Sequence, residues 1–374
     1  MAYRHFILTR DYTGSRMLYG TTGSWASHDL DLVNYAYGVA YDNTRKAIYT
    51  DVDSVITKYN GTSWIVVGDT GAAGYEWGMF AYGGTIYAIH WEGADIYSST
   101  DGGANWTAAG SFLPSVVADD DYPMPDFVLA TNGTLHAAWW VPGALGGGVY
   151  VGCELHYAST DDLGATWDNA ETLWTGSLDE ISNLFWPLIA VSGVNVFVIG
   201  VCKIPSSGND YDSMVFASHD SGASWAQGSD LDPDVFSMPR AFCASDTLLH
   251  VFALEYFTQS YIREGTSDDI ASGTPTFALA NEIDNGDLGL AGTPTGVQVA
   301  TEKIWPSEDN AGRNATFLWK AMVAGKEHAY WYYWKADGTA ELLRDGTCNV
   351  SGVAGRAFLA SGDVTRRNAG VWIM

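Results

Sequence analysis

Two arginines occupy matching positions in two similar segments of the sequence. Arg240–Ser245 and Arg356–Ser361 are identical except that Leu359 stands in place of Cys243. A guanidinium presents a planar fork of donors that can grip a carboxylate with two parallel hydrogen bonds. Arg240 and Arg356 are therefore candidate ligands of an anionic group. The alternative is that each arginine pairs with a nearby carboxylate, such as Asp126, and holds the fold together.

A second group of residues lies at the ends of predicted strands. Aromatic rings beside carboxylates and a histidine suit a sugar, because rings stack on its C–H faces while acids accept hydroxyl hydrogens. Packing of the tryptophan rings in the core is the alternative. No residue is assigned a catalytic role. The further ligand-binding candidates are Glu76, Asp126, His90, Trp91, Trp139, Trp140, Glu255 and Tyr256.

No metal or cofactor is expected. Calcium prefers oxygen ligands, which the run Asp119–Asp121 and the alternating Asp230, Asp232 and Asp234 offer, but the second pattern lacks the glycine and distal glutamate of an EF-hand. Solvated loop acids are the preferred interpretation. The glycine-rich segment 142–148 is expected to be a flexible loop, either a lid or a turn. The four cysteines form no CxxC pair and are expected to be small buried side chains.

The elements that position these residues follow from an internal repeat. Ser99–Trp106, Thr160–Trp167 and Ser218–Trp225 share an eight-residue box with Asp third, Gly fifth and Trp last. Weaker copies occupy residues 9–17, 57–64, 267–277 and 337–341. The last aromatic or apolar position of the box recurs roughly every 54 residues, and this period is typical of repeat architectures.

Alternating apolar and polar segments between the boxes, bounded by Gly and Asp, predict short strands and no helices. Four-stranded antiparallel sheets repeated radially form a β-propeller. We therefore expect an all-β chain that forms a single β-propeller domain over residues 1–374, with seven four-stranded blades and six blades as the alternative. The N-terminal strands within 3–19 and the C-terminal strands within 352–374 are expected to share one blade and close the ring.

The boxes resemble the Asp-boxes, or BNR repeats, of sialidase-like β-propellers. The resemblance implies that each box is a hairpin joining a blade's third and fourth strands, turned away from the ligand end of the channel. The aspartates are then expected to accept backbone N–H groups, the glycines to supply backbone freedom, and the tryptophans to pack into the sheet. The structural residues of the boxes are Asp101, Gly103, Trp106, Asp162, Gly164, Trp167, Asp220, Gly222 and Trp225.

Composition excludes several partners. Lys plus Arg number 18 against 44 Asp plus Glu, which gives a formal net charge of −26. A body this acidic repels phosphate backbones and anionic lipid heads, so we expect neither nucleic-acid binding nor membrane insertion. The first ten residues lack the apolar core of a secretory signal, so a virion or the cytoplasm is the expected location.

Two functions follow from these features. The preferred one is a non-enzymatic binding or structural propeller that recognises a glycan or a protein on its channel face. A bacteriophage tail or receptor-binding subunit, with virion assembly partners, is one form of it. The alternative is a sialidase-like exo-glycosidase.

The resemblance implies that such an enzyme uses three arginines, a tyrosine nucleophile and an aspartate acid/base. Arg240 and Arg356 could join Arg313 here, and 330–333 offers tyrosines, but the F/Y-R-I-P element is missing and no aspartate can be placed. A hydrolase that pairs Glu76 with Asp126 or Glu255 is a further variant.

Overall fold

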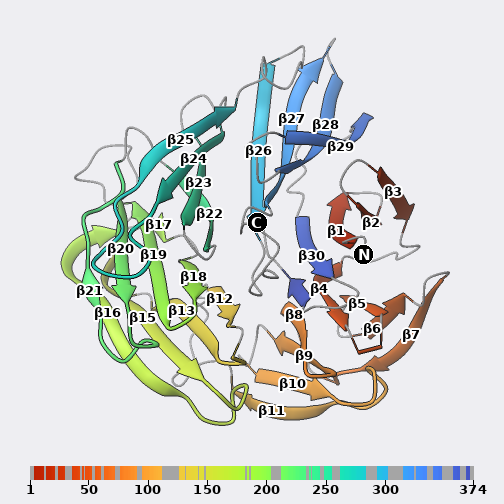
Figure 1. Cartoon of the computed structure of the whole chain (residues 1–374), viewed down its shortest axis with the longest axis horizontal. Helices are drawn as coiled ribbons and strands as arrows, with labels where there is room; N and C mark the ends of the chain where they lie inside the picture. Colours follow the sequence, from red (N-terminus) through yellow and green to blue (C-terminus); the bar gives the residue numbers. More distant parts are fainter. Residues whose placement is uncertain are drawn as a thin grey trace. The chain divides into compact units, whose positions relative to one another are not determined.

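A computed structural model covers residues 1–374. It describes the backbone of the strands given below. It describes side chains only for residues 40, 42, 44–45, 47, 49, 55–59, 63–71, 79–89, 95–110, 126–130, 132–141, 143, 152–176, 187–202, 213–232, 236, 239, 242, 244, 248–253 and 262–282. In the described part of the chain, regular secondary structure is entirely β-strand, which confirms the all-β prediction (Figure 1).

Several sheets consist of four antiparallel strands in which neighbours along the chain are neighbours in the sheet. This is the meander that the spacing of strand and turn segments predicts. The first such sheet contains β4 (Ala36–Asp42), β5 (Ala47–Val52), β6 (Val55–Tyr59) and β7 (Trp64–Asp69). The next contains β8 (Glu76–Tyr82), β9 (Thr85–His90), β10 (Asp95–Ser99) and β11 (Thr107–Ser111). A third contains β22 (Met238–Ala244), β23 (Leu249–Leu254), β24 (Ile262–Ser267) and β25 (Ala278–Ile283). A fourth contains β26 (Thr293–Thr301), β27 (Ala315–Val323), β28 (Lys326–Trp334) and β29 (Ala340–Thr347).

Other sheets have five strands. One contains β12 (Asp126–Leu129), β13 (Leu135–Val141), β14 (Ala144–Gly146), β15 (Val149–Thr160) and β16 (Asp168–Ile181). A second contains β17 (Asn183–Leu184), β18 (Leu188–Ser192), β19 (Asn195–Lys203), β20 (Asp212–Ser218) and β21 (Ala226–Gln227). A third joins β3 (Ser24–Asp29), β2 (Gly14–Thr21) and β1 (Arg4–Asp11) to β30 (Ala357–Gly362) and β31 (Asn368–Gly370).

Turn chemistry explains how these hairpins close. Tyr82 pairs with Thr85 across a two-residue turn, and Gly83 and Gly84 adopt φ values of 60° and 84°. A type I′ turn requires positive φ at both central residues, which glycine adopts without strain. The pair of glycines thus fixes the register of β8 against β9.

The segment predicted to be a flexible loop is partly a strand. Residues 144–146 form β14, which pairs with residues 149–151 of β15. The pairing of β13 with β15 ends where Val141 lies opposite Glu154, but β15 begins five residues earlier, at Val149. The backbone groups of this first part of β15 therefore need another partner on that side. The prediction of a flexible loop over 142–148 is therefore wrong for these three residues, which form a strand.

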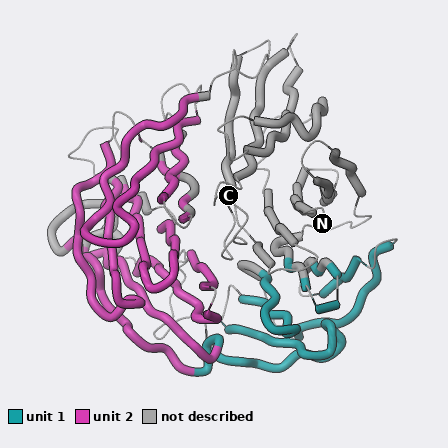
Figure 2. Tube along the Cα trace, viewed as in Figure 1, with its two compact units in different colours: residues 1–113, 163–165, 291–374 teal, residues 114–162, 166–290 magenta. Residues whose placement is uncertain are grey.

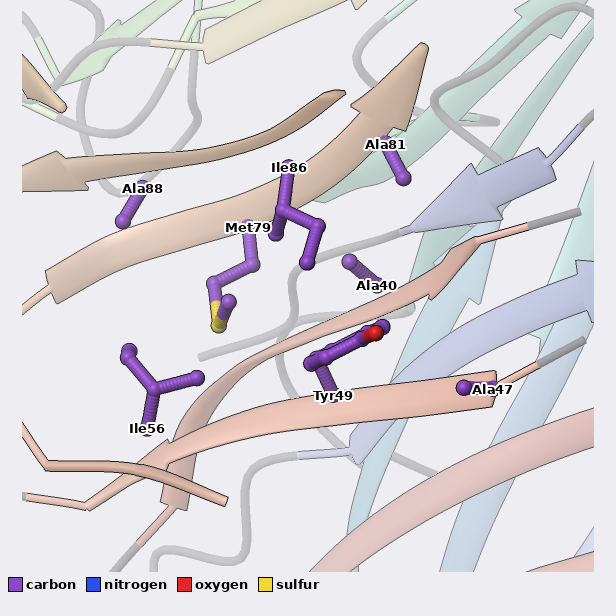
Figure 3. Packing of buried hydrophobic residues seen from close by; sticks show 8 residues of the cluster. All are labelled: Ala40, Ala47, Tyr49, Ile56, Met79, Ala81, Ile86 and Ala88. Carbon is purple, nitrogen blue, oxygen red and sulfur yellow. The ribbon is translucent and has the colours of Figure 1, made fainter. Parts of the chain in front are cut away.

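The chain divides into two compact units, each described by itself (Figure 2). Unit 1 contains residues 1–113, 163–165 and 291–374, and unit 2 contains residues 114–162 and 166–290. In unit 1, β4 lies beside β8, and the space between their two sheets is filled by eight buried side chains (Figure 3). These are Ala40, Ala47, Tyr49, Ile56, Met79, Ala81, Ile86 and Ala88.

In unit 2, the first full strands of three consecutive sheets lie side by side, with β12 and β22 on either side of β18. The sheets behind them pack closely. Gly200 lies so near its neighbours that a methyl group there would come within 2.7 Å of Leu155 Cδ2. Because no larger residue fits, Gly200 allows the β13–β15 and β18–β20 layers to meet without a gap.

The two ends of the chain meet in unit 1. β1 pairs with β30 in antiparallel register, with Ile7 opposite Leu359 and Leu8 opposite Phe358. Within the two segments predicted to close the ring, residues 3, 12–13, 352–356, 363–367 and 371–374 lie outside the described residues. No helix in the described part of the chain has the length and hydropathy to cross a bilayer.

Candidate functional site

The first box forms the turn between β10 and β11. Asp101 Oδ1 accepts the backbone N–H groups of Ala104 and Asn105, each at 3.0 Å, and Oδ2 accepts Asn105 Nδ2 at 2.7 Å. Ser99 Oγ donates to the same carboxylate at 2.8 Å. These donors hold the pKa of Asp101 well below its usual range, with the Asn105 side chain contributing most. The carboxylate is therefore ionised and fully engaged in the turn.

The other two strong boxes repeat this arrangement between β15 and β16 and between β20 and β21. Asp162 Oδ1 accepts Thr166 N at 2.8 Å, and Asp220 Oδ1 accepts Ser224 N at 2.8 Å. Hydrogen bonds from the Ser224 side chain and backbone lower the pKa of Asp220 to about 2. An aspartate held in this state has no proton to give at neutral pH, which fits a structural role in the turn.

The box glycines and tryptophans complete the turn. Gly103, Gly164 and Gly222 have φ values of 93°, 102° and 91°, which residues with a Cβ rarely adopt. Trp106 Nε1 donates to Gly103 O at 2.9 Å, and Trp225 Nε1 donates to Gly222 O at 3.0 Å. Trp167 is half-buried.

A tyrosine of the preceding sheet packs against two of the boxes, a contact that the sequence analysis missed. Tyr157 of β15 lies under Gly222, where a methyl group would come within 2.1 Å of its Oη, and its ring meets Trp225 edge-on at 4.6 Å. Tyr49 of β5, labelled in Figure 3, contacts the first box less tightly, since a methyl group on Gly103, the counterpart of Gly222, would lie 3.7 Å from its Cε1. Both tyrosines lie on strands that also carry polar residues, and nothing in the sequence shows which box each of them meets.

Tyr157 also contacts a buried histidine. Its Oη lies 2.7 Å from His136 Nδ1, and both side chains are buried. Burial lowers the pKa of His136 to about 4 and raises that of Tyr157 above its usual value. His136 is therefore neutral at pH 7 and can accept the phenol hydrogen.

Among the ligand-binding candidates, Asp126 has a clear structural partner. Its side chain is buried at the start of β12, and Oδ2 accepts the backbone N–H of Ile189 in β18 at 2.9 Å. A hydrogen bond of this kind satisfies two polar groups that would otherwise be buried without a partner. Asp126 therefore connects two neighbouring first strands.

Trp139 and Trp140 are 1% and 0% exposed. Trp139 stacks on His156 with ring centroids 5.6 Å apart, and Trp140 meets Trp174 edge-on at 5.9 Å. Rings without exposed surface cannot stack on a sugar, so their burial supports the core-packing alternative for these two residues. His156 is half-buried and pairs with Glu154, with Nε2 and Oε2 2.8 Å apart.

For three of the remaining ligand-binding candidates the structure describes only the backbone, and the others lie outside the described residues. Glu76 lies opposite His90 in the β8–β9 ladder, which puts the two residues on one side of that sheet. Arg240 lies in a β-bulge of β22, between the paired residues Pro239 and Ala241. Bulges re-aim side chains at strand ends. The other candidates lie outside the described residues; they are Trp91, Glu255, Tyr256 and Arg356.

A buried polar cluster in the β22–β25 sheet was also missed. His250 Nδ1 lies 2.9 Å from Glu264 Oε1, and both side chains are 0% exposed. Asn281 Nδ2 donates to Glu264 Oε2 at 2.6 Å. The signal in the sequence was the presence of charged and polar residues at positions where strand alternation predicts apolar ones.

Few of the described residues could bind a metal ion or react as a thiol. No three His, Cys, Asp or Glu side chains among the described residues gather closely enough to hold a metal ion. Asp230 and Asp232 are exposed, whereas Asp119–Asp121 and Asp234 lie outside the described residues. Cys153 and Cys202 are buried, and burial raises the pKa of the Cys153 thiol.

Comparison with known proteins identifies the fold. No family model and no curated protein matches the sequence. A putative 6-phosphogluconolactonase from Bacteroides fragilis is similar in structure at 12% identity and a TM-score of 0.54, over 97% of this chain and 98% of that one. The polysaccharide lyase Uly1 is similar at 10% identity and a TM-score of 0.51, over 97% and 85%. YCF48 from Cyanidioschyzon merolae is similar at 13% identity and a TM-score of 0.43, over 92% and 97%.

The chain has a β-propeller-like fold. At these identities the similarity concerns the fold alone, and one propeller-like scaffold serves both binding proteins and enzymes. The boxes suggest membership of the sialidase-like family, which the comparisons do not confirm.

Proposed function

We propose that this chain is a non-enzymatic β-propeller that binds a glycan or a protein through the loops at the starts of its first strands. The observation that carries the proposal is the bond between Asp126 Oδ2 and Ile189 N. A general acid or base must be free to exchange a proton with a substrate, whereas Oδ2 of the buried Asp126 side chain already accepts a backbone N–H. Asp126 therefore supports a rigid binding scaffold better than a catalytic pair.

The proposal includes the finer architecture that the sequence predicts. Seven blades, closed by N- and C-terminal strands in one shared blade, would place the first strands around a central channel. The pairing of β1 with β30 supports closure of this kind. Arg240 and Arg356 would then project from corresponding first-strand positions and contact an anionic group of the partner.

The test measures binding and turnover together. A glycan array and a fluorogenic glycosidase panel that includes sialosides would be run on wild type, Arg240→Ala and Asp126→Asn. Arg263→Ala is the matched control, because Arg263 pairs with Glu282 at 2.7 Å on the outer strands β24 and β25. We expect glycan binding without turnover, weakened about tenfold or more by Arg240→Ala, left intact by Asp126→Asn and unchanged by Arg263→Ala.

Turnover that Asp126→Asn abolishes would contradict the proposal and support the alternative, a glycoside hydrolase with paired carboxylates. The pairing of Glu76 with His90 in the β8–β9 register is the observation that favours this alternative, because both residue types can transfer protons. A virion role is the most specific form of the binding proposal. It predicts that the protein co-sediments with purified particles and resists removal by salt washing.

A further inference from the structure

Strand β7 is the last strand of its sheet, and in the described part of the chain it pairs with β6 alone (Figure 1). The outer side of such a strand carries a row of backbone N–H and C=O groups that no strand of its own sheet pairs. Ile65 and Val66, near the start of β7, are 44% and 69% exposed. The free edge of β7 is therefore bordered by exposed apolar side chains.

These two side chains lie on opposite faces of the sheet, because successive residues of a strand alternate between its faces. In the register, Ile65 lies opposite Lys58 and Val66 lies opposite Thr57. The run Trp64–Val67 consists of apolar residues only. A continuous apolar run is typical of a strand that is buried on both faces. β7 thus has the sequence of an interior strand but stands at the edge of its sheet.

The other outer strands whose side chains the structure describes do not share this pattern. β16 exposes Asp168 and Glu171, and β25 exposes Glu282 beside the apolar Leu279. The described side chains of β11 and β21 are small or polar. Charged side chains on an edge strand discourage pairing with another chain. Among these strands, β7 therefore combines a free edge with large apolar side chains and no charge beside them.

Charge favours a second copy of the chain as the partner at this edge. The formal net charge of −26 makes two copies repel each other over most of their surface. Residues 36–69, which form the β4–β7 sheet, contain four aspartates, one arginine and two lysines, a net charge of −1. Residues 76–111 and 126–181, which form the next two sheets, carry −4 and −8. Two copies can therefore approach through the β4–β7 sheet with little repulsion.

The edge of β7 is also complementary to a copy of itself. A two-fold axis perpendicular to the sheet places the start of one strand opposite the end of the other, which is the antiparallel arrangement. Such an axis keeps each face of the sheet on the same side in both copies. Ile65 then meets apolar side chains of the second copy on one face, and Val66 meets them on the other.

We propose that β7 pairs antiparallel with β7 of a second copy and joins the two β4–β7 sheets into one continuous sheet. The pairing satisfies the free backbone groups of both edges and buries Ile65 and Val66 of each copy. This interface is separate from the ligand site proposed above. It lies on the last strand of a sheet, whereas the ligand site lies at the starts of the first strands.

Two measurements on the wild-type protein test the dimer. Sedimentation equilibrium is expected to show a monomer–dimer equilibrium at protein concentrations up to about 200 μM. Added salt is expected to tighten the dimer, because it screens the repulsion between two acidic bodies. Hydrogen–deuterium exchange of the amides in residues 64–67 is expected to slow severalfold as the protein concentration rises. The amides of residues 278–282, on the outer strand β25, are expected to keep their rates.

Val66→Lys places a charge where the second strand packs, and it is expected to raise the dissociation constant of the dimer about tenfold or more. Val194→Lys is the matched control, because Val194 is 55% exposed in the turn between β18 and β19 and belongs to no outer strand. Leu279→Lys changes an exposed apolar residue on a different outer strand. Both of these variants are expected to dimerise like wild type.

A wild-type protein that stays monomeric at every concentration would overturn the proposal. A dimer that Val66→Lys leaves intact, or that protects residues 278–282 instead of 64–67, would also overturn it, because the contact would then lie elsewhere. The exchange measurement needs no variant, so the test does not depend on whether Val66→Lys folds.

Discussion

Each box aspartate accepts several hydrogen bonds from donors in its own turn. For Asp220 these are the backbone and side chain of Ser224 and the hydroxyl of Ser218. Its pKa of about 2 in the folded chain lies below the value of about 3.9 for an unfolded aspartate. The carboxylate therefore stabilises the fold above pH 4, and this stabilisation disappears as the pH falls from 4 toward 2.

Asp220→Asn is accordingly expected to lower the urea midpoint at pH 6 but to differ little from wild type near pH 2.5. The control is Asp168→Asn, because Asp168 is exposed on β16, just after a box. A deficit in Asp220→Asn that is equally large at both pH values would show that the charge of this carboxylate does not matter.

Close packing at Gly222 gives a second residue-scale prediction. Alanine there would suffer both a φ of 91° and a Cβ 2.1 Å from Tyr157 Oη. We expect Gly222→Ala to destabilise the chain by well over ~1 kcal/mol in chemical denaturation. Gly193→Ala is the matched control, because Gly193 has a φ of 60° and nothing within 4 Å of the added carbon. Equal losses in the two variants would mean that backbone strain alone accounts for the effect.

His136 gives the fold a second acid-sensitive group. With a folded pKa of about 4 and an unfolded value of about 6.5, the unfolded chain takes up a proton that the folded chain resists. Stability should therefore fall between pH 6.5 and pH 4, by roughly 3 kcal/mol at most. His136→Gln is expected to remove this part of the pH dependence, as measured by urea titration across that range. A wild-type slope preserved in the variant would assign the acid sensitivity to another group.

Strand β12 is tied to strand β18 by one buried carboxylate, and this is the clearest dependence at the scale of elements. Asp126→Ala would leave Ile189 N without an acceptor in a buried position, which costs about 1–3 kcal/mol. Asp126→Asn keeps an amide oxygen in the same place and should lose less. Thermal unfolding of both variants tests this order, and a greater loss in Asp126→Asn than in Asp126→Ala would contradict it.

At the scale of the whole molecule, the pairing of β1 with β30 links the two ends of the chain. The register places Leu8 opposite Phe358. Cysteines at these two positions should form a disulfide on mild oxidation and raise the thermal midpoint, because directly opposed strand residues lie within the reach of a disulfide. Leu8→Cys with Ala360→Cys is the register-shifted control, detected by the same mass spectrometry of peptides. Efficient cross-linking of the control alone would show a different register.

Much of the fold could be predicted from sequence because its signals are local. Strand alternation, turn glycines and the three boxes depend on residues within eight positions of one another, and their hydrogen bonds and positive φ values are found where the pattern places them. The net charge of −26 likewise needs no coordinates. The sequence by itself therefore determined an all-β chain with repeated clamped turns.

The tertiary structure alone decided which polar and aromatic residues belong to the core. The ring of Trp140 and the carboxylate of Asp126 occupy sequence positions that suit a ligand face, but contacts across 34 and 63 residues of chain engage them in packing. His219 shows the same limit, since its partner Gly273 lies 54 residues away. Periodicity along a strand fixes the side on which a residue lies, whereas the neighbouring sheet decides what it meets there.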